Sequence, residues 1–261
     1  MTNLSINGVN YSIPSKWNEL TKEQLLYISE ILLRKYDVDK FNIFVFRYIT
    51  GIPWTQFVRI FKNNAPVLAE IIESLEFIHN KNTLTVNLFP TIEIDKIKLI
   101  GPADGLQDTV FEEFFLYTEN SFANYFKTKE ESHLNILIAS LYRKEYNGIP
   151  NCREPFNPHT VENRITLIEK LTPELKNCIL LFYSGCRNLI MASFPDLFKE
   201  QTKTVKDSLS YLKLIDRLSN GAVVNNESVK QTNVYEVCVR LREMQKETEE
   251  LQNQLNKSNH V

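Results

Sequence analysis

The sequence predicts a mainly helical fold of the α+β type: a multi-helix bundle with a small antiparallel β-sheet and a C-terminal coiled-coil-like helix. Three observations support this prediction. Apolar residues recur with helical spacing through most of the chain, whereas two segments alternate apolar and polar residues as strands do. Glycine is scarce, with 7 residues in 261. That scarcity argues against a turn-rich β-sandwich or a doubly wound nucleotide fold, because both need glycine at tight corners.

The N-terminal segment is expected to form a hairpin followed by a helix. Residues 4–13 read as two short strands around Asn7-Gly8, which is a strong signal for a two-residue hairpin turn. Thr21 and Gln24 have the spacing of a capping box, which places the start of the first helix. The apolar spacing then predicts a helix over 22–35.

Three further helices are expected before residue 80. The second helix carries apolar residues between Phe41 and Ile49 on one face, and Gly51 stands where a C-terminal capping glycine belongs. Pro53 favours the start of a short third helix. A fourth helix is predicted over 66–79.

Residues 83–100 show the second strand pattern. Alternation over 84–88 and again over 92–99 predicts strands, with a phase slip at Asp95-Lys96 that indicates a turn or a bulge. Because an isolated two-stranded hairpin is marginal in water, we expect this segment to join the N-terminal hairpin in one antiparallel sheet.

The middle of the chain returns to helical patterns. Gly101 to Gly105 ends the strand, and Thr109 with Glu112 forms a second capping-box pattern. This pattern is expected to open an aromatic-rich helix, followed by an amphipathic helix over 129–142. The aromatic residues expected on the inner side of the first helix are Phe111, Phe115, Phe122 and Phe126.

The second half is expected to be helical throughout. A proline-containing loop over 147–158 is a candidate hinge, and helices are predicted over 159–170, 173–193 and 207–219. The helix over 173–193 is apolar nearly all round at 179–183, which is typical of a central, buried helix. Ser184 and Gly185 are small residues that favour close helix packing, because they let a neighbour approach.

These elements suggest a division of the chain into three parts. Residues 1–146 would hold the hairpin, helices and small sheet, residues 147–230 a helical bundle continuing the same core, and residues 231–261 the C-terminal heptad helix and a frayed end.

A net charge of −2 gives no global field that would attract nucleic acid or an anionic membrane. Neither a signal peptide nor a membrane span is expected. Four scattered cysteines, without a paired motif, suit free and mostly buried thiols in a reducing cytoplasm.

No catalytic, cofactor-binding or metal-binding constellation is predicted. His159 and Glu162 share a helical face, but one such pair in this order is better explained by a helix start. The loop from Gly101 to Gly105 lacks the lysine and the glycine spacing of a phosphate-binding loop. Basic pairs such as Arg34-Lys35 and Arg143-Lys144 fall at helix ends, where the helix dipole favours cations, and are expected to be solvated.

The C-terminal helix is the candidate partner-binding element. Its apolar residues repeat in steps of three and four over three heptads, with charged and amide residues between them, which is a short coiled-coil pattern. The proximal half is expected to pack on the protein's own bundle. For the distal half, pairing between chains and projection as a polar helix both remain open. The candidate partner-binding residues are Val237, Leu241, Met244, Leu251 and Leu255.

Four groups of residues, in this order, resemble proteins encoded near the tail genes of Bacteroidetes phages and prophages, similar to tail assembly chaperones or minor tail components. The resemblance extends over about 6–241, and its motifs are structural. It implies no active-site residue. The groups are Pro14 to Gln24; Gly101 to Leu106 with Thr109 to Phe114; Leu141 to Arg143 with Arg153 to Phe156; and Phe182 to Leu189 with Phe194 to Phe198.

The resemblance implies a non-enzymatic role in phage or prophage tail assembly, in which the protein binds an apolar helical partner as a chaperone. The expected partner is a tape-measure-like chain or another tail component, or a second copy of this chain through the C-terminal helix. One alternative is a structural virion component such as a connector, baseplate or minor tail subunit. A less favoured alternative is a nucleic-acid-binding regulator that uses the basic helix ends.

Overall fold

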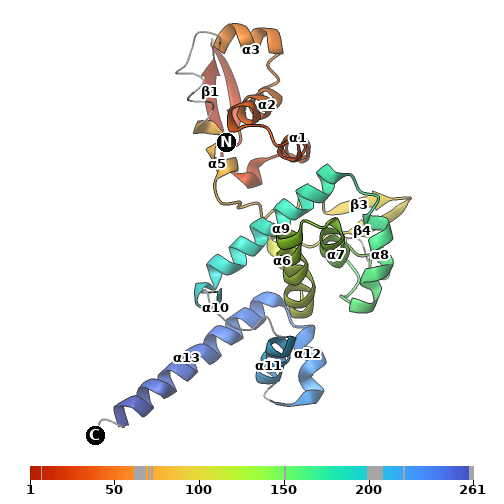
Figure 1. Ribbon diagram of the computed structural model, residues 1–261, viewed down its shortest axis with the longest axis vertical. Helices are drawn as coiled ribbons and strands as arrows, with labels where there is room; N and C mark the ends of the chain where they lie inside the picture. Colours follow the sequence, from red (N-terminus) through yellow and green to blue (C-terminus); the bar gives the residue numbers. More distant parts are fainter. Residues whose placement is uncertain are drawn as a thin grey trace.

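The computed structural model describes residues 1–6, 8–61, 69, 71, 73–149, 151–198, 208–219 and 221–258. Within these residues the chain is mainly helical with short antiparallel strands, which confirms the predicted fold class. The molecule is elongated, with the N-terminal helices at one end, a long central helix, and the C-terminal helix leading to the other end (Figure 1). No helix in the described part of the chain is both long enough and apolar enough to cross a membrane.

The N-terminal elements follow the local signals closely. The backbone NH of Gln24 donates to the Thr21 hydroxyl at 3.2 Å, and the Thr21 NH donates to the Gln24 side chain at 2.9 Å, so the predicted capping box is present. Gly51 ends the second helix in the left-handed conformation, with φ of 68°. The elements are β1 (Thr2–Ile6), β2 (Val9–Ile13), η1 (Trp17–Glu19), α1 (Lys22–Leu33), α2 (Val38–Thr50) and α3 (Trp54–Phe61).

The middle segment differs from prediction in how its strands pair. The two hairpins do not join: β1–β2 and β3–β4 are separate two-stranded sheets, although Asp95 and Lys96 do form the predicted turn. Part of the helix predicted over 66–79 lies outside the described residues. The elements are α5 (Glu76–His79), β3 (Thr91–Ile94), β4 (Ile97–Ile100), η2 (Asp104–Leu106), the π-helical η3 (Glu112–Thr118), α6 (Glu119–Thr128) and α7 (Glu131–Leu141).

The strand predicted over 84–88 is wrong, because side chains occupy its backbone amides. The NH of Leu84 donates to Asn82 Oδ1 at 2.8 Å, and the NH of Thr85 donates to Asn18 Oδ1 at 2.7 Å. The NH of Asn87 donates to an Asp104 carboxylate oxygen at 2.7 Å. These bonds hold the segment in an irregular extended path that pairs with none of the described strands.

The second predicted capping box is also wrong. The aromatic-rich helix has Phe111 as its N-cap, without a side-chain capping bond. Thr109 is used elsewhere: its hydroxyl accepts from Arg153 at 3.1 Å, and its carbonyl accepts from the Val234 NH at 3.0 Å. Phe126, expected on the inner side of this helix, is 48% exposed.

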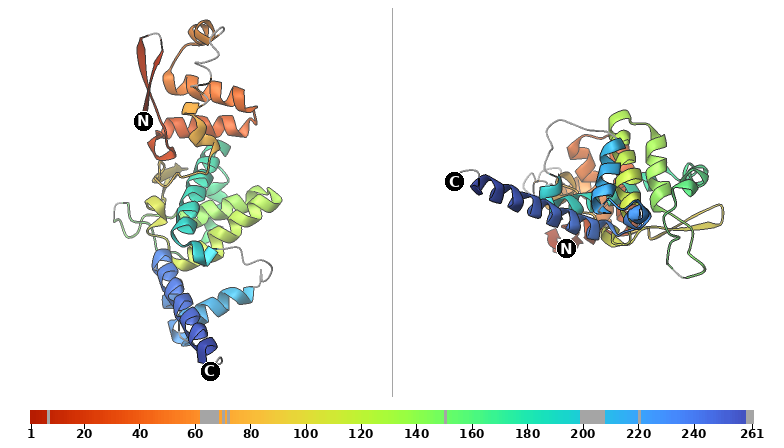
Figure 2. Two further views of the ribbon diagram at one scale, coloured as in Figure 1. Left: turned by 90° about the vertical axis from the view of Figure 1, so that its left-hand side faces the viewer. Right: turned by 90° about the horizontal axis from the view of Figure 1, so that it is seen from below.

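The second half is helical as predicted, and α9 is its longest packed element. It runs diagonally through the middle of the molecule, between the N-terminal helices and α13 (Figures 1 and 2). The elements are η4 (Pro158–Thr160), α8 (Val161–Ile168), α9 (Pro173–Ser193), α10 (Pro195–Phe198), α11 (Ser208–Leu218), η5 (Val223–Asn225), α12 (Asn226–Lys230) and α13 (Val234–Ser258).

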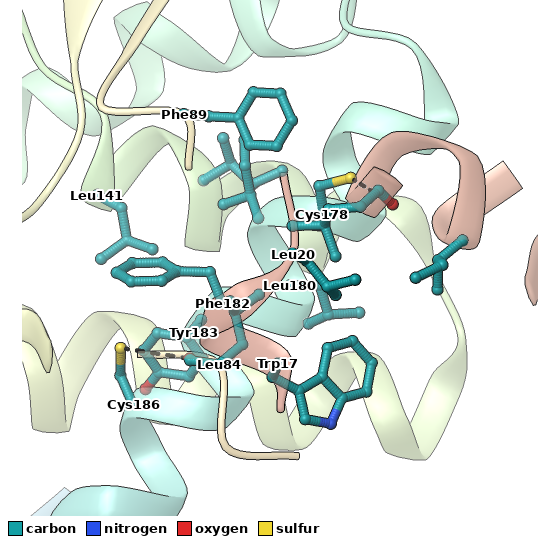
Figure 3. Close-up of a cluster of buried hydrophobic side chains, with 14 of the residues drawn as sticks. Trp17, Leu20, Leu84, Phe89, Leu141, Cys178, Leu180, Phe182, Tyr183 and Cys186 are labelled. Atoms are coloured by element: carbon teal, nitrogen blue, oxygen red, sulfur yellow. Dashed lines mark hydrogen bonds between the residues drawn. The ribbon is translucent and has the colours of Figure 1, made fainter. Parts of the chain in front are cut away.

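The main hydrophobic core is built around α9. Phe182 and Tyr183 on this helix meet Trp17, Leu84 and other buried residues from several elements (Figure 3). Gly185 allows a close approach, because a Cβ placed there would lie 2.1 Å from the carbonyl oxygen of Leu84. The expectation of close packing at this glycine is therefore confirmed, although the neighbour is an extended segment and not a helix. The core joins residues from Ile6 to Cys238, and the predicted three-part division of the chain stays a prediction.

A buried ion-pair cluster fastens the loop over 147–158 to the body. Arg153 in this loop donates to Glu113 at 2.8 Å and to Asp108 at 2.7 Å. The expectation that Arg143 is solvated is wrong: its side chain is 3% exposed and lies 3.3 Å from the same Glu113. Burial lowers the pKa of Arg143 to about 10, so the group stays charged at neutral pH. The candidate hinge loop is thus tied down by two arginines sharing one buried carboxylate.

Candidate partner-binding site

The C-terminal helix is attached to the body at its first turn. The NH of Phe111 donates to the Thr232 carbonyl at 2.8 Å, and the NH of Val234 donates to the Thr109 carbonyl at 3.0 Å, forming a short antiparallel bridge. The Tyr235 hydroxyl donates to the Gly105 carbonyl at 2.6 Å. These bonds fix the direction in which α13 leaves the body.

Beyond its first turn, α13 packs on a second, smaller hydrophobic core. Its fully buried members are Phe111, Ile215, Leu218 and Val237. Leu241 and Met244 pack partly buried against this cluster. The proximal half of the heptad pattern therefore packs on the protein's own helices, as expected.

The five predicted partner-binding residues fall into three environments. Val237 is only 3% exposed and is not accessible to a partner, whereas Leu241 and Met244 are half-buried at the edge of the second core. Leu251 is 60% exposed on the part of α13 that extends past the other helices (Figures 1 and 2). The side chain of Leu255 lies outside the described residues. The structure thus separates a packed half of the heptad pattern from an exposed half.

A groove with a volume of about 400 Å³ lies where α13 passes α10, α11 and η3. Leu241, Met244 and Thr248 line it on the α13 side, and these are three successive positions of the predicted heptad seam. The other side is mainly apolar and aromatic. The lining residues outside α13 are Phe115, Leu197, Phe198, Leu214 and Arg217.

Four apolar groove residues were not among the predicted site residues: Phe115, Leu197, Phe198 and Leu214. They come from three elements, η3, α10 and α11, and no local pattern groups them. The signals in the sequence were the inner position expected for Phe115 and the motif from Phe194 to Phe198, which the resemblance already included. A site composed of such residues becomes visible only when the helices are placed in space.

The charges around the groove are distributed unevenly. Arg217 stands at the rim, where it is exposed, together with Gln245 and Glu249. Along α13, residues 240–246 contain three basic and one acidic side chain, whereas residues 247–254 contain three glutamates and no basic side chain. The helix therefore changes from basic to acidic as it passes the groove.

A second hollow, of about 780 Å³, lies on another side of α13 against α11 and α12. Polar and charged side chains make up much of its lining, including Glu236, Arg240 and Glu243. Burial raises the pKa of Tyr235, which borders this hollow, to about 12. Burial also raises the pKa of the Cys238 thiol to about 12. Neither group is ionised at neutral pH, so neither is activated as a nucleophile.

Outside the two hollows beside α13, the described residues offer few candidate catalytic or metal-binding side chains. His159 and Glu162 are both exposed at the start of α8. Within the described ranges, no group of three or more histidine, cysteine, aspartate or glutamate side chains is placed to hold a metal ion. Cys178 and Cys186 are buried free thiols, and Cys152 is an exposed one.

Comparison of the chain with protein-family models, with curated proteins and with solved structures found no match in any of the three.

Proposed function

We propose that this chain is a non-enzymatic helix-binding protein, and that it serves as a chaperone in phage or prophage tail assembly in the bacterial cytoplasm. The observation that carries the proposal is the apolar groove between α10, α11 and α13. Its α13 wall includes the heptad-seam residues Leu241, Met244 and Thr248, which are only partly covered by the chain itself. The tail role rests on the family resemblance of the sequence.

The dimensions of this surface suit an amphipathic helix. The seam from Leu241 to Leu251 spans ten residues, which is about 15 Å or nearly three helical turns. A helix laid along it would place residues at i, i+3, i+4 and i+7 against the aromatic wall formed by Phe115 and Phe198. Such a partner would bury Leu251, which the chain leaves exposed.

The partner expected from the resemblance is a tape-measure-like chain or another tail component with long amphipathic helices. The alternative is a permanent virion subunit, which would use the same groove to hold a neighbouring tail protein. The two roles differ in one property, because a chaperone leaves the finished particle and a subunit stays in it.

The test is a capture experiment with a peptide control. The tagged protein is expressed with the neighbouring genes, captured partners are identified by mass spectrometry, and a peptide of the partner's amphipathic helix is titrated into the purified protein. Leu251→Lys should weaken peptide binding at least about tenfold, because a charged side chain would be buried at the seam. Val224→Lys also replaces an apolar residue by lysine, in η5 at a position that is 89% exposed, and should leave binding unchanged.

Three outcomes separate the possibilities. Capture of a tail protein whose helix binds the groove, with the bait missing from finished particles, supports the chaperone. Bait recovered in purified particles makes the protein a virion subunit. Equal peptide binding by wild type and Leu251→Lys would remove the groove and its seam as the site.

A further inference from the structure

We infer that in the free protein the groove is occupied by the distal half of α13 from a second copy of this chain, with the two α13 helices antiparallel. The inference rests on the proposed function, because it takes the groove to be a helix acceptor, and it adds how that groove is covered before a partner arrives. Each copy would insert its projecting segment into the groove of the other. Such an arrangement is isologous and closes at two copies.

The chain itself carries a segment that fits the groove. The end of α13, after the groove-lining Glu249, continues beyond α11 and α12 (Figure 1), and Leu251 on this segment is 60% exposed. Leu251 belongs to the same heptad seam as Leu241 and Met244, which line the groove. An exposed leucine on a projecting helix and an apolar groove on the same helix are complementary surfaces.

The seam also has an antiparallel register that matches its residues. With the helices crossing at residue 246, Leu241 lies opposite the partner subunit's Leu251, and Met244 lies opposite the partner subunit's Thr248. Apolar seam positions thus face each other at both ends of the contact. The partner subunit's Leu251 would then lie beside Leu241, which lines the groove.

The charge distribution selects the antiparallel orientation. Residues 240–246 carry three basic and one acidic side chain, and residues 247–254 carry three acidic side chains. Antiparallel helices place the acidic segment of each copy beside the basic segment of the other, whereas parallel helices place acidic beside acidic. Arg217, which also lines the groove, adds a further cation to the site that the acidic segment would enter.

Self-pairing of this kind regulates the proposed site. A partner helix must displace the second copy before it reaches Leu241 and Met244, so the apparent affinity for the partner falls as the protein concentration rises. The exposed apolar seam is also kept away from unrelated proteins until a tighter-binding helix is present.

The first experiment measures the molar mass of the purified protein without any partner. Light scattering and sedimentation from about 1 to about 200 µM should show a change from 30.5 kDa to twice that mass. Leu251→Lys should raise the dissociation constant at least about tenfold, and Val224→Lys should not change it. A protein that is monomeric throughout, or a Leu251→Lys variant that dimerises like wild type, overturns the inference.

A second experiment reads the orientation. A spin label is placed at Gln254→Cys, an exposed position on the projecting part of α13, with Cys152→Ser removing the exposed thiol. Antiparallel helices crossing at residue 246 separate the labelled positions by about 24 Å along the axis, whereas parallel helices bring them to about 10 Å. A short distance overturns the proposed arrangement. Neither experiment uses a partner, so their failure leaves the peptide titration as a separate test of the proposed function.

Discussion

Replacing Gly185 by alanine is expected to destabilise the protein, although the usual effect of this change in a helix is the opposite. Glycine inside a helix is about 0.5–1 kcal/mol less favourable than alanine. At this position, however, a Cβ would lie 2.1 Å from the Leu84 carbonyl oxygen and 2.6 Å from the Leu84 nitrogen. Real Cβ atoms do not approach backbone this closely, so α9 or the segment at Leu84 must move.

The segment at Leu84 is poorly able to move, because several bonds hold it. Asn82 donates to the Leu181 carbonyl at 2.7 Å and accepts through its own carbonyl from Asn188 at 2.9 Å, so it is fixed to α9 on both sides. On its other side, Thr85 is bonded to Asn18. Overpacking of a well-packed interior typically costs about 1–3 kcal/mol, and this clash is with backbone. After the gain in helix propensity, we expect a net loss of about 2 kcal/mol.

The assay is urea unfolding followed by circular dichroism, comparing Gly185→Ala with Ser184→Ala. Ser184 is the neighbouring residue on the same helix and is only half-buried, so its replacement should change stability by no more than about 0.5 kcal/mol. Equal or greater stability of Gly185→Ala would show that the approach of Leu84 to α9 does not constrain the fold, and would refute the reasoning.

Two further predictions concern buried carboxylates. Glu113→Gln should destabilise the protein by about 3–5 kcal/mol, because Arg143 and Arg153 lose their shared buried counter-charge. In the same urea titration, Glu145→Gln, which removes only a surface pair, should cost less than about 1 kcal/mol. Similar losses for both variants would contradict the role of the cluster. Burial raises the pKa of Glu112, so its contribution to stability is present below about pH 4.5 and is lost as pH rises through its folded pKa. Glu112→Gln should therefore gain stability relative to wild type between about pH 4 and about pH 7, and a difference that stays constant in unfolding titrations across this range would contradict the assignment.

The parts of the fold that could be predicted are those fixed by local chemistry. The Thr21 capping box, the Gly51 cap and the turn at Asp95-Lys96 each depend on a few neighbouring residues, and each is present. Residues 84–88 have strand alternation, yet their amides are taken by side chains from distant segments. Arg143 has the sequence position of a solvated helix end and becomes buried only because Glu113 faces it.

The candidate site was predictable to a similar extent. The heptad pattern identified Leu241 and Met244, which line the groove, because that pattern is local to α13. It also included Val237, whose burial depends on the placement of α11. The opposite wall joins Phe115 with Phe198 through tertiary packing: spacing predicted an inner position for Phe115, but not that it would meet Phe198 at a groove.

The two hydrophobic cores differ greatly in size, and the proposed binding groove lies at the smaller one. The main core draws buried side chains from β1 through to Cys238, whereas the second core has four fully buried members among the described residues. Local stability follows the number of buried apolar contacts, so α11 and the distal part of α13 open more readily than α9. A helix that packs on Leu241 and Met244 adds apolar contacts to the smaller core and stabilises it. Binding at the groove can therefore order or rearrange the C-terminal helices while the main core stays intact, which is the property that a reversible helix-binding protein requires.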